Sequence, residues 1–427
     1  MKKILASGGA LLMASALGSK ILGLFRDRLF VEHFADTGQI DYIFAAFRIP
    51  DFFFFLLIGG TVSTLFLPRI VDLKSREKWQ FFSSFFWGVF LFFGLFCGIA
   101  SFFPEFFVKI FAAGFTGDAQ VEVAQLARYL FGSVFFLAIS SVFSAAQQAQ
   151  QKFLSIALAP ILYTGTICIG VYFFAGIWGL SSIGLFAILG AFLHLAMNSS
   201  AYFLTGGKLG YFWKKPTSAW NNFGTDLSFR TVNNAAFQIN QSADVWIASF
   251  LAVGSVSAYQ IGANLGMVLF SIIGIPIARA IFPKLTNCKN NIVKQKAIIF
   301  DSLKWVLLMT IPATFIGFWW AEFWLSFLFN LDGDILRMST IVLKWVILSL
   351  PFAAVLPILS RIFLANDNVI TPMKISATSL FIATITAYVL ALKVFPPETA
   401  VLGLAIGTFL ANFLSATLFG YFVWKKK

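Results

Sequence analysis

The sequence predicts an all-α polytopic membrane protein, with about twelve transmembrane helices in two six-helix lobes related by a parallel internal repeat around a central cavity. Its composition, its long charge-free intervals and its recurring landmarks predict this fold. Of 427 residues, 59% are hydrophobic and only 11% are charged, whereas soluble domains have roughly 45–50% apolar and ~25% charged residues. This composition excludes a soluble enzyme, a disordered regulator and a nucleic-acid-binding protein.

Charge-free intervals locate the spans, because a helix that crosses the hydrocarbon core needs about 20 mostly apolar residues. The first segment resembles a secretory signal, with a basic start, an apolar run and small residues. Its pattern continues to Arg26 with no soluble domain behind it, so we interpret it as a retained span. The spans are predicted at roughly 4–30, 39–67, 79–103, 123–148, 153–174, 183–205, 227–251, 256–283, 298–320, 338–360, 370–393 and 400–424, with uncertain ends.

The distribution of basic residues predicts the orientation, because cytoplasmic loops of membrane proteins carry an excess of Lys and Arg. With the N-terminus inside, the inner segments hold nineteen basic residues and the outer loops hold three, Lys109, Arg337 and Lys393. The net charge of +13 therefore follows the membrane topology. We expect a multi-pass protein of the bacterial plasma (inner) membrane with both termini in the cytoplasm.

The two halves of the chain resemble each other. Gly59 precedes Pro68-Arg69-Ile70 by nine residues, and Gly274 precedes Pro283-Lys284-Leu285 by the same interval. Upstream, Asp27 to Tyr42 matches Asp244 to Tyr259. Both sets of six helices start on the cytoplasmic side of the membrane, so the two halves have the same orientation and form a parallel repeat. We therefore expect an N-terminal lobe at 1–205, a cytoplasmic linker at 206–226 and a C-terminal lobe at 227–427.

Several ionisable and polar residues fall within the predicted spans, where charge is costly and usually faces a cavity. Helix seven carries a polar stripe of Asn and Gln, and helix four ends in a stripe of Ser and Gln; both are expected at the lobe interface. The candidate substrate-binding residues are Lys20, Arg26, Arg48, Arg230 and Asn264, and the candidate ion-coupling or structural polar residues are Asp27, Asp41, Asn240 and Asp244.

Structural interpretations of the same residues remain open. Asp27 and Asp244 are either ion or proton sites or structural partners of Arg26 and Arg230. The Asn and Gln stripes either line the cavity or join helices by hydrogen bonds. His194 is interpreted as a packed histidine rather than a proton relay.

No catalytic or metal-binding motif is present. The sequence lacks HExxH, GxSxG and Walker signatures, and its three cysteines are too scattered for a disulfide framework or a metal site. We expect no catalytic residues, no metal and no cofactor.

Two pairs of segments nevertheless carry a family resemblance. The segment SKILGLFRD at 19–27, followed by DYIFAAFRIPD at 41–51, resembles the N-terminal signature of the MurJ/MviN lipid II flippases. QIN at 238–240, Asp244, ASFL at 248–251 and GSVS at 254–257 are similar to the passage from helix seven to helix eight of that family. The family belongs to the multidrug/oligosaccharidyl-lipid/polysaccharide exporter superfamily.

The resemblance implies a V-shaped, alternating-access flippase that moves undecaprenyl-diphosphate-linked peptidoglycan precursor (lipid II) to the outer leaflet, in service of cell-wall synthesis and cell shape. In that family, basic cavity residues engage the diphosphate, and Lys20 and Arg26 stand at such positions. We expect Lys20, Arg26 and Arg48 to form the anionic-headgroup site, with Arg230 contributed by the second lobe. The expected partners are the lipid-linked precursor and membrane lipids, with no nucleic acid, and the expected state is a monomer. Coupling to the membrane potential or a monovalent ion, with Asp244 as the ion or proton site, is a further expectation.

The chain departs from the family pattern at several positions. Phe54, Phe55 and Gly59 replace an arginine pair and a glutamate, and Asn264 replaces an arginine in helix eight. Members commonly carry two more helices than the twelve predicted here, associated with a groove for the lipid tail. These departures leave open an exporter of another polyprenyl-linked oligosaccharide, a drug/cation antiporter of the same superfamily, a membrane-embedded glycosyl enzyme and a non-transporting assembly protein.

Overall fold

The computed structural model describes residues 2–59, 62–210, 218–289, 291–366, 368 and 370–425, and this part of the chain is helical without a β-strand. Its contacts divide it into two compact units, Met1–Ser242 and Ala243–Lys427. The boundary between the units falls inside a helix, whereas the internal repeat places the lobe boundary at the linker 206–226. The lobe limits and the central cavity stay predictions.

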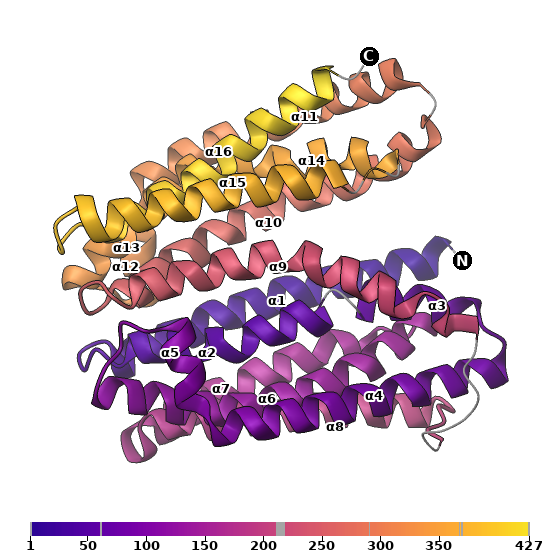
Figure 1. Cartoon of the computed structure of the whole chain (residues 1–427), viewed down its shortest axis with the longest axis horizontal. Coiled ribbons are helices and arrows are strands. Elements are labelled where there is room, and N and C mark those ends of the chain that lie inside the picture. The colour runs from indigo at the N-terminus through magenta and orange to yellow at the C-terminus, as the bar shows by residue number, and fades with distance from the viewer. Residues whose placement is uncertain are drawn as a thin grey trace. The chain divides into compact units, whose positions relative to one another are not determined.

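The first unit is a bundle of long apolar helices. Figure 1 shows its helices α4, α6 and α8 running alongside one another, and α7 packs against both α8 and α1. The signal-like first segment belongs to one continuous helix of 33 residues, and its retention as a span stays a prediction. The elements are α1 (Lys2–Phe34), α2 (Ile40–Phe54), the π-helices η1 (Phe55–Gly59) and η2 (Val62–Phe66), α3 (Leu67–Asp72), α4 (Ser75–Phe102), α5 (Pro104–Phe111), α6 (Asp118–Ala149), α7 (Leu154–Trp178), α8 (Leu180–Leu204), the 3-10 helix η3 (Ser218–Trp220) and α9 (Phe223–Ala248), which continues into the second unit.

The second unit repeats this order of helices. In each half, a short helix follows the third long helix: α5 follows α4, and α12 follows α11. In each half, a pair of packed helices comes last, α7 with α8 and α15 with α16. The parallel repeat predicted from the sequence is therefore visible in the order of elements. The elements of the second unit are α10 (Ser255–Asn287), α11 (Ile292–Trp319), α12 (Ala321–Phe329), α13 (Gly333–Leu348), α14 (Leu350–Ala365), α15 (Ile370–Val389), the π-helix η4 (Leu390–Val394) and α16 (Val401–Lys425).

Within the described residues, nine helices are long and apolar enough to cross a membrane, and a bent pair raises this to ten. The bent pair is α13 with α14, which meet at 43° and occupy the predicted span 338–360. Pro351 lies in the first turn of α14, where its missing N–H costs nothing, so the chain changes direction there. With α1 and α9, which are long but are not among the ten, the structure is compatible with twelve spans.

Pro50 falls inside the second predicted span, where a proline predicts a break in the helix, and this prediction is wrong. Helix α2 continues through Pro50 to Phe54, and the irregularity comes later, in two π-helical segments between Phe55 and Phe66. Membrane helices tolerate proline because neighbouring groups and local π adjustments satisfy the freed carbonyl. Such π segments are frequent at functional sites.

Close helix contacts explain two of the three GxxxG spacings that fall within long helices, at Gly94–Gly98, Gly262–Gly266 and Gly403–Gly407. A Cβ atom on Gly266 would lie 2.3 Å from Val346 of α13, and one on Gly403 would lie 2.5 Å from the backbone nitrogen of Ala391. At Gly98, by contrast, a Cβ would meet nothing within 4 Å. The first two glycines therefore let helices approach closely, and Gly98 does not.

A buried arginine joins α2 to α9 inside the first unit. Arg48 is only 8% exposed, and its guanidinium donates four hydrogen bonds to neutral oxygens of α9. Nε bonds Ser242 Oγ at 3.1 Å, Nη1 bonds Gln241 Oε1 at 3.1 Å, and Nη2 bonds both the carbonyl and the side-chain oxygen of Gln238 at 2.9 Å. The polar stripe of α9 thus supplies the acceptors that allow a cation to be buried between these helices.

This arrangement predicts that Arg48→Met lowers the stability of the purified protein. Interhelical hydrogen bonds in membrane proteins contribute about 0.6 kcal/mol each, so losing four should cost about 2 kcal/mol. The measurement is thermal denaturation in detergent. Arg28→Met is the matched control, because Arg28 is 40% exposed and forms only an i,i+4 pair with Glu32. Equal melting temperatures for the two variants would contradict a stabilising role for Arg48.

Candidate functional site

Arg26 of α1 forms an ion pair with the residue that follows it. Its Nη2 lies 2.7 Å and its Nε 3.1 Å from the same carboxylate oxygen, Oδ1 of Asp27. The Asp27 side chain is 4% exposed and that of Arg26 is 22% exposed. One of the two sequence interpretations of Asp27, a partner for Arg26, is therefore present in the structure.

Aromatic rings also hold the Arg26 guanidinium. Its central carbon lies 5.3 Å from the ring centroid of Phe30 and 5.6 Å from that of Phe47, which is the neighbour of Arg48 in α2. Such cation–π contacts favour a fixed position for a desolvated guanidinium. An arginine has five N–H donors, and the two hydrogen bonds to Asp27 leave three of them over.

The side chains of Arg26 and Arg48 lie in one cluster at α1 and α2. Phe47, which precedes Arg48 in α2, contacts the Arg26 guanidinium, and Asp51 follows Arg48 by three residues, about one turn further along α2. Asp27 compensates the charge of Arg26, and oxygens of α9 compensate that of Arg48, because an uncompensated buried charge is very costly.

The remaining first-unit candidates lie around this cluster. Lys20 is half-buried and stands seven residues before Asp27, so both are on one face of α1. Asp41 is buried in the first turn of α2, where a carboxylate stabilises the helix dipole. Asn240 of α9 is half-buried. All three lie within helices, and their roles in substrate binding stay predictions.

In the second unit, Asp244 has a defined partner. The Tyr259 hydroxyl donates a hydrogen bond of 2.7 Å to Asp244 Oδ2 and lies 3.0 Å from Thr408 Oγ1, so α9, α10 and α16 meet at one polar point. Asp244 is 6% exposed. Asn264 of α10 is exposed. The side chain of Arg230 lies outside the described residues.

A polar network inside the first unit accounts for the stripe at the end of α6. Ser140 Oγ lies 2.7 Å from His194 Nδ1 and accepts a hydrogen bond of 3.0 Å from Asn198 of α8. Gln147 donates to the Asn198 carbonyl at 2.6 Å and accepts from Ser155 of α7. Ser140 and Gln147 are almost fully buried within the unit, so placing them at the lobe interface was wrong. They join helices instead, and His194 is a packed histidine, as predicted.

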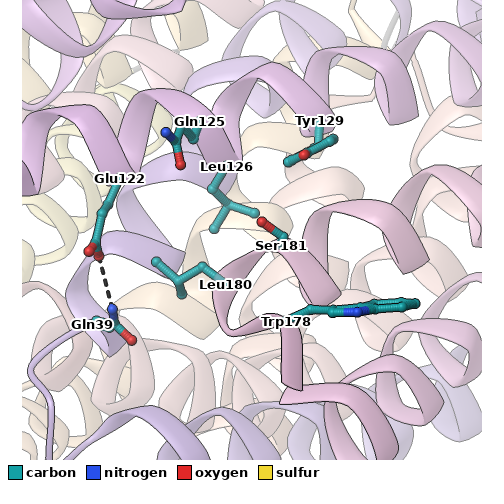
Figure 2. Close-up of a pocket in the computed structure, with 8 residues that line it drawn as sticks. All are labelled: Gln39, Glu122, Gln125, Leu126, Tyr129, Trp178, Leu180 and Ser181. Atoms are coloured by element: carbon teal, nitrogen blue, oxygen red, sulfur yellow. Dashed lines mark hydrogen bonds between the residues drawn. The ribbon is translucent and has the colours of Figure 1, made fainter. Parts of the chain in front are cut away.

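Two pairings had no signal in the sequence. Arg69 of α3 binds Asp226 of α9 at 2.5 Å and the Ala219 carbonyl at 2.9 Å, across more than 150 residues of chain. Gln39, which precedes α2, donates to Glu122 of α6 at 3.0 Å at the rim of a pocket, drawn in Figure 2. Arg69 and Gln39 lie in landmarks of the internal repeat, but no pattern in the sequence identifies Asp226 or Glu122 as their partners, and only folding brings these residues together.

Among the described residues, no group of three or more His, Cys, Asp and Glu side chains is arranged to hold a metal ion. The site is therefore the α1–α2 cluster, which we define as Arg26 and Asp27 of α1 and Arg48 of α2. Its guanidinium groups can bind oxygen-rich anionic groups.

Comparison with known proteins shows the family. The family model described as Lipid II flippase MurJ matches residues 30–427. A protein of Borreliella burgdorferi named probable lipid II flippase MurJ is 25% identical over 86% of this chain and 74% of its own length. One of the same name from Thermotoga maritima is 24% identical over 95% of this chain and 84% of its own length.

Solved structures share the fold. A structure titled lipid II flippase MurJ, inward closed conformation, superposes with a TM-score of 0.83 at 22% identity, over 97% of this chain and 88% of that one. An inward-facing multidrug resistance MATE family transporter of the MOP superfamily gives 0.72 at 12% identity, over 95% and 94%. The predicted superfamily fold is confirmed, and because the family model spans nearly all of the sequence, the chain belongs to the MurJ family of lipid II flippases.

Proposed function

We propose that this protein is an alternating-access flippase that moves lipid II, the undecaprenyl-diphosphate-linked peptidoglycan precursor, from the inner to the outer leaflet. The match of the MurJ family model to residues 30–427 is the observation that carries the proposal. The similarity to MATE transporters is one of fold, so no observation favours a drug/cation antiporter. A transporter of this kind transforms no substrate, so we propose a non-enzymatic role with the lipid-linked precursor and membrane lipids as its partners, and a monomeric state.

The α1–α2 cluster supplies the chemistry for the diphosphate. A diphosphate that enters a low-dielectric site loses its hydration, and fixed positive charge offsets that loss. Arg26 is the best candidate, since Phe30, Phe47 and Asp27 fix its guanidinium while donors remain for phosphate oxygens. Arg48 already donates to α9, so we assign it to positioning α2 and leave Lys20 as the second cation of the headgroup site.

A substitution series at Arg26 and Asp27 separates binding from structure. Arg26→Ala and Arg26→Glu should abolish transport. Arg26→Lys should retain part of it, because lysine keeps the positive charge but cannot bind two phosphate oxygens side by side as a guanidinium does. Asp27→Asn is the control, since it removes the ion pair and keeps the cation. The measurement is accumulation of lipid-linked precursor in the inner leaflet of cells that depend on each variant.

The pattern across the series distinguishes the roles. If Arg26→Ala and Asp27→Asn fail equally and do not accumulate in the membrane, the pair serves only to hold α1. Normal transport by a properly inserted Arg26→Ala protein would eliminate Arg26 as a headgroup ligand.

We also propose that the protein lies in the bacterial inner membrane with both termini in the cytoplasm, on the support of the basic-residue distribution. A reporter enzyme that is active only in the periplasm should work when fused after Lys109 and fail when fused after Lys208. Cell fractionation with immunoblotting controls for expression of both fusions. The opposite activity pattern would reverse the orientation.

We further propose that transport is coupled to the membrane potential or to a monovalent ion. Moving one elementary charge across a membrane potential of 100 mV changes the free energy by about 2.3 kcal/mol. This energy is enough to favour one orientation of a cavity that carries net positive charge. Asp244 is the candidate ion or proton site, because it is a buried carboxylate that two hydroxyl-bearing helices approach.

Asp244→Asn should therefore weaken the dependence of transport on pH or sodium by at least several-fold. Tyr259→Phe is the matched variant, because it removes the hydrogen bond and keeps the carboxylate. Transport is measured in vesicles across a range of pH and of sodium concentration. An unchanged dependence in Asp244→Asn would end the coupling role of this residue.

A further inference from the structure

The first unit holds a small polar pocket away from the arginine cluster. Three segments line it: the residue that precedes α2, the first three turns of α6, and the turn between α7 and α8 (Figure 2). Its volume is ≈ 190 Å³. The lining residues are Gln39, Glu122, Gln125, Leu126, Tyr129, Trp178, Leu180 and Ser181.

The backbone of the α7–α8 turn places an aromatic ring at this pocket. Gly179 has φ 53° and ψ −136°, a conformation that side chains rarely allow, so the chain reverses between Trp178 and Leu180. The Trp178 ring stacks on Phe174 with centroids 4.7 Å apart, yet it stays 46% exposed. The indole is thus held in position and remains available to a ligand.

Packing also holds the opposite wall. A Cβ atom on Gly184 of α8 would lie 2.6 Å from Tyr129, so the absence of a side chain there lets α6 and this ring approach α8. On the other side, the hydrogen bond from Gln39 to Glu122 ties the start of α2 to α6. The pocket is therefore built by fixed elements.

The chemistry of the lining favours a sugar. Figure 2 shows the polar side chains of Gln39, Glu122, Gln125 and Ser181 arranged around Leu126 and Leu180. Amide and hydroxyl groups both donate and accept, as sugar hydroxyls do, and a carboxylate accepts strongly. The leucines and the indole offer apolar surface to the C–H face of a ring. No lysine or arginine lines the pocket, so it does not suit a phosphate.

The size of the pocket agrees with this ligand. At ≈ 190 Å³ the pocket is of the order of a single sugar ring and far smaller than a whole lipid-linked precursor.

We propose that this pocket binds one amino-sugar ring of the glycan headgroup. The proposal rests on the proposed function and on the orientation, which places the pocket at the outer end of the first unit, where the headgroup is delivered. The sugar and the diphosphate would then be recognised by separate groups, the first by this pocket and the second by the α1–α2 cluster.

Ligand-observed saturation-transfer NMR tests the proposal on the full-length protein, with N-acetylglucosamine and its β-1,4-linked dimer as probes. The protein is kept in a detergent without a sugar headgroup, because a maltoside would compete. We expect saturable binding in the millimolar range. Trp178→Ala and the isosteric Glu122→Gln should each weaken it at least five-fold, and Trp178→Phe should retain most of it. Trp319→Ala is the control, since Trp319 of α11 is 69% exposed and lies in the other unit.

The outcomes separate this inference from the proposed function. Absence of saturation transfer in the wild-type protein, or wild-type binding by both Trp178→Ala and Glu122→Gln, would overturn the sugar site while leaving transport untouched. Arg26→Ala should bind the sugars normally. Sugar binding together with normal transport by Arg26→Ala would instead remove the proposed headgroup role of Arg26 and leave the sugar site in place.

Discussion

The cost of charge in a hydrocarbon environment governs this structure more than any single contact. Each buried ionisable group described here has oxygen or nitrogen partners close by: Arg26 has Asp27, Arg48 has the oxygens of α9, and Asp244 has Tyr259. Because water is absent at this depth, these partners must come from the protein itself. The polar residues of α1, α2 and α9 are therefore an interdependent set, and removing one member leaves a buried group without compensation.

The same constraint separates residues that act on substrate from residues that hold helices. Arg48 donates its hydrogen bonds to α9, and Ser140 and Gln147 are hydrogen-bonded to Asn198 of α8, so the first role of all three is packing. Arg26 differs, because its single carboxylate partner and two aromatic neighbours fix the guanidinium without using all of its donors. The residues suited to bind substrate are therefore those whose hydrogen-bonding groups are not all used in holding helices together. This reasoning also makes the pocket at Glu122 and Trp178 informative, since Gln39 and Glu122 bond to each other there and Gln125 and Ser181 line the pocket beside them.

The departures from the family pattern reduce the number of cations that the protein must hold in a hydrocarbon environment. Phe54 and Phe55, which replace an arginine pair, fall at the transition from α2 into π-helical backbone, and Asn264 is exposed on α10. With fewer cations available, recognition of a large anionic headgroup falls on the few that remain. A separate site for the uncharged part of the headgroup would add binding energy that does not depend on charge. It would offset the smaller number of arginines in this chain.

The sequence by itself determined the class of protein, the approximate spans and the repeat, because these depend on composition, on charge-free length and on landmarks that recur along the chain. It also placed Lys20, Arg26, Arg48 and Asp244 at membrane depth, since charged residues stand out in apolar segments. Only the tertiary structure decided which partners they take. Arg69 with Asp226 and Gln39 with Glu122 join segments whose spacing carries no periodic signal. The path through Pro50 was also beyond the sequence, because neighbouring helices decide whether a proline ends a membrane helix or merely distorts it.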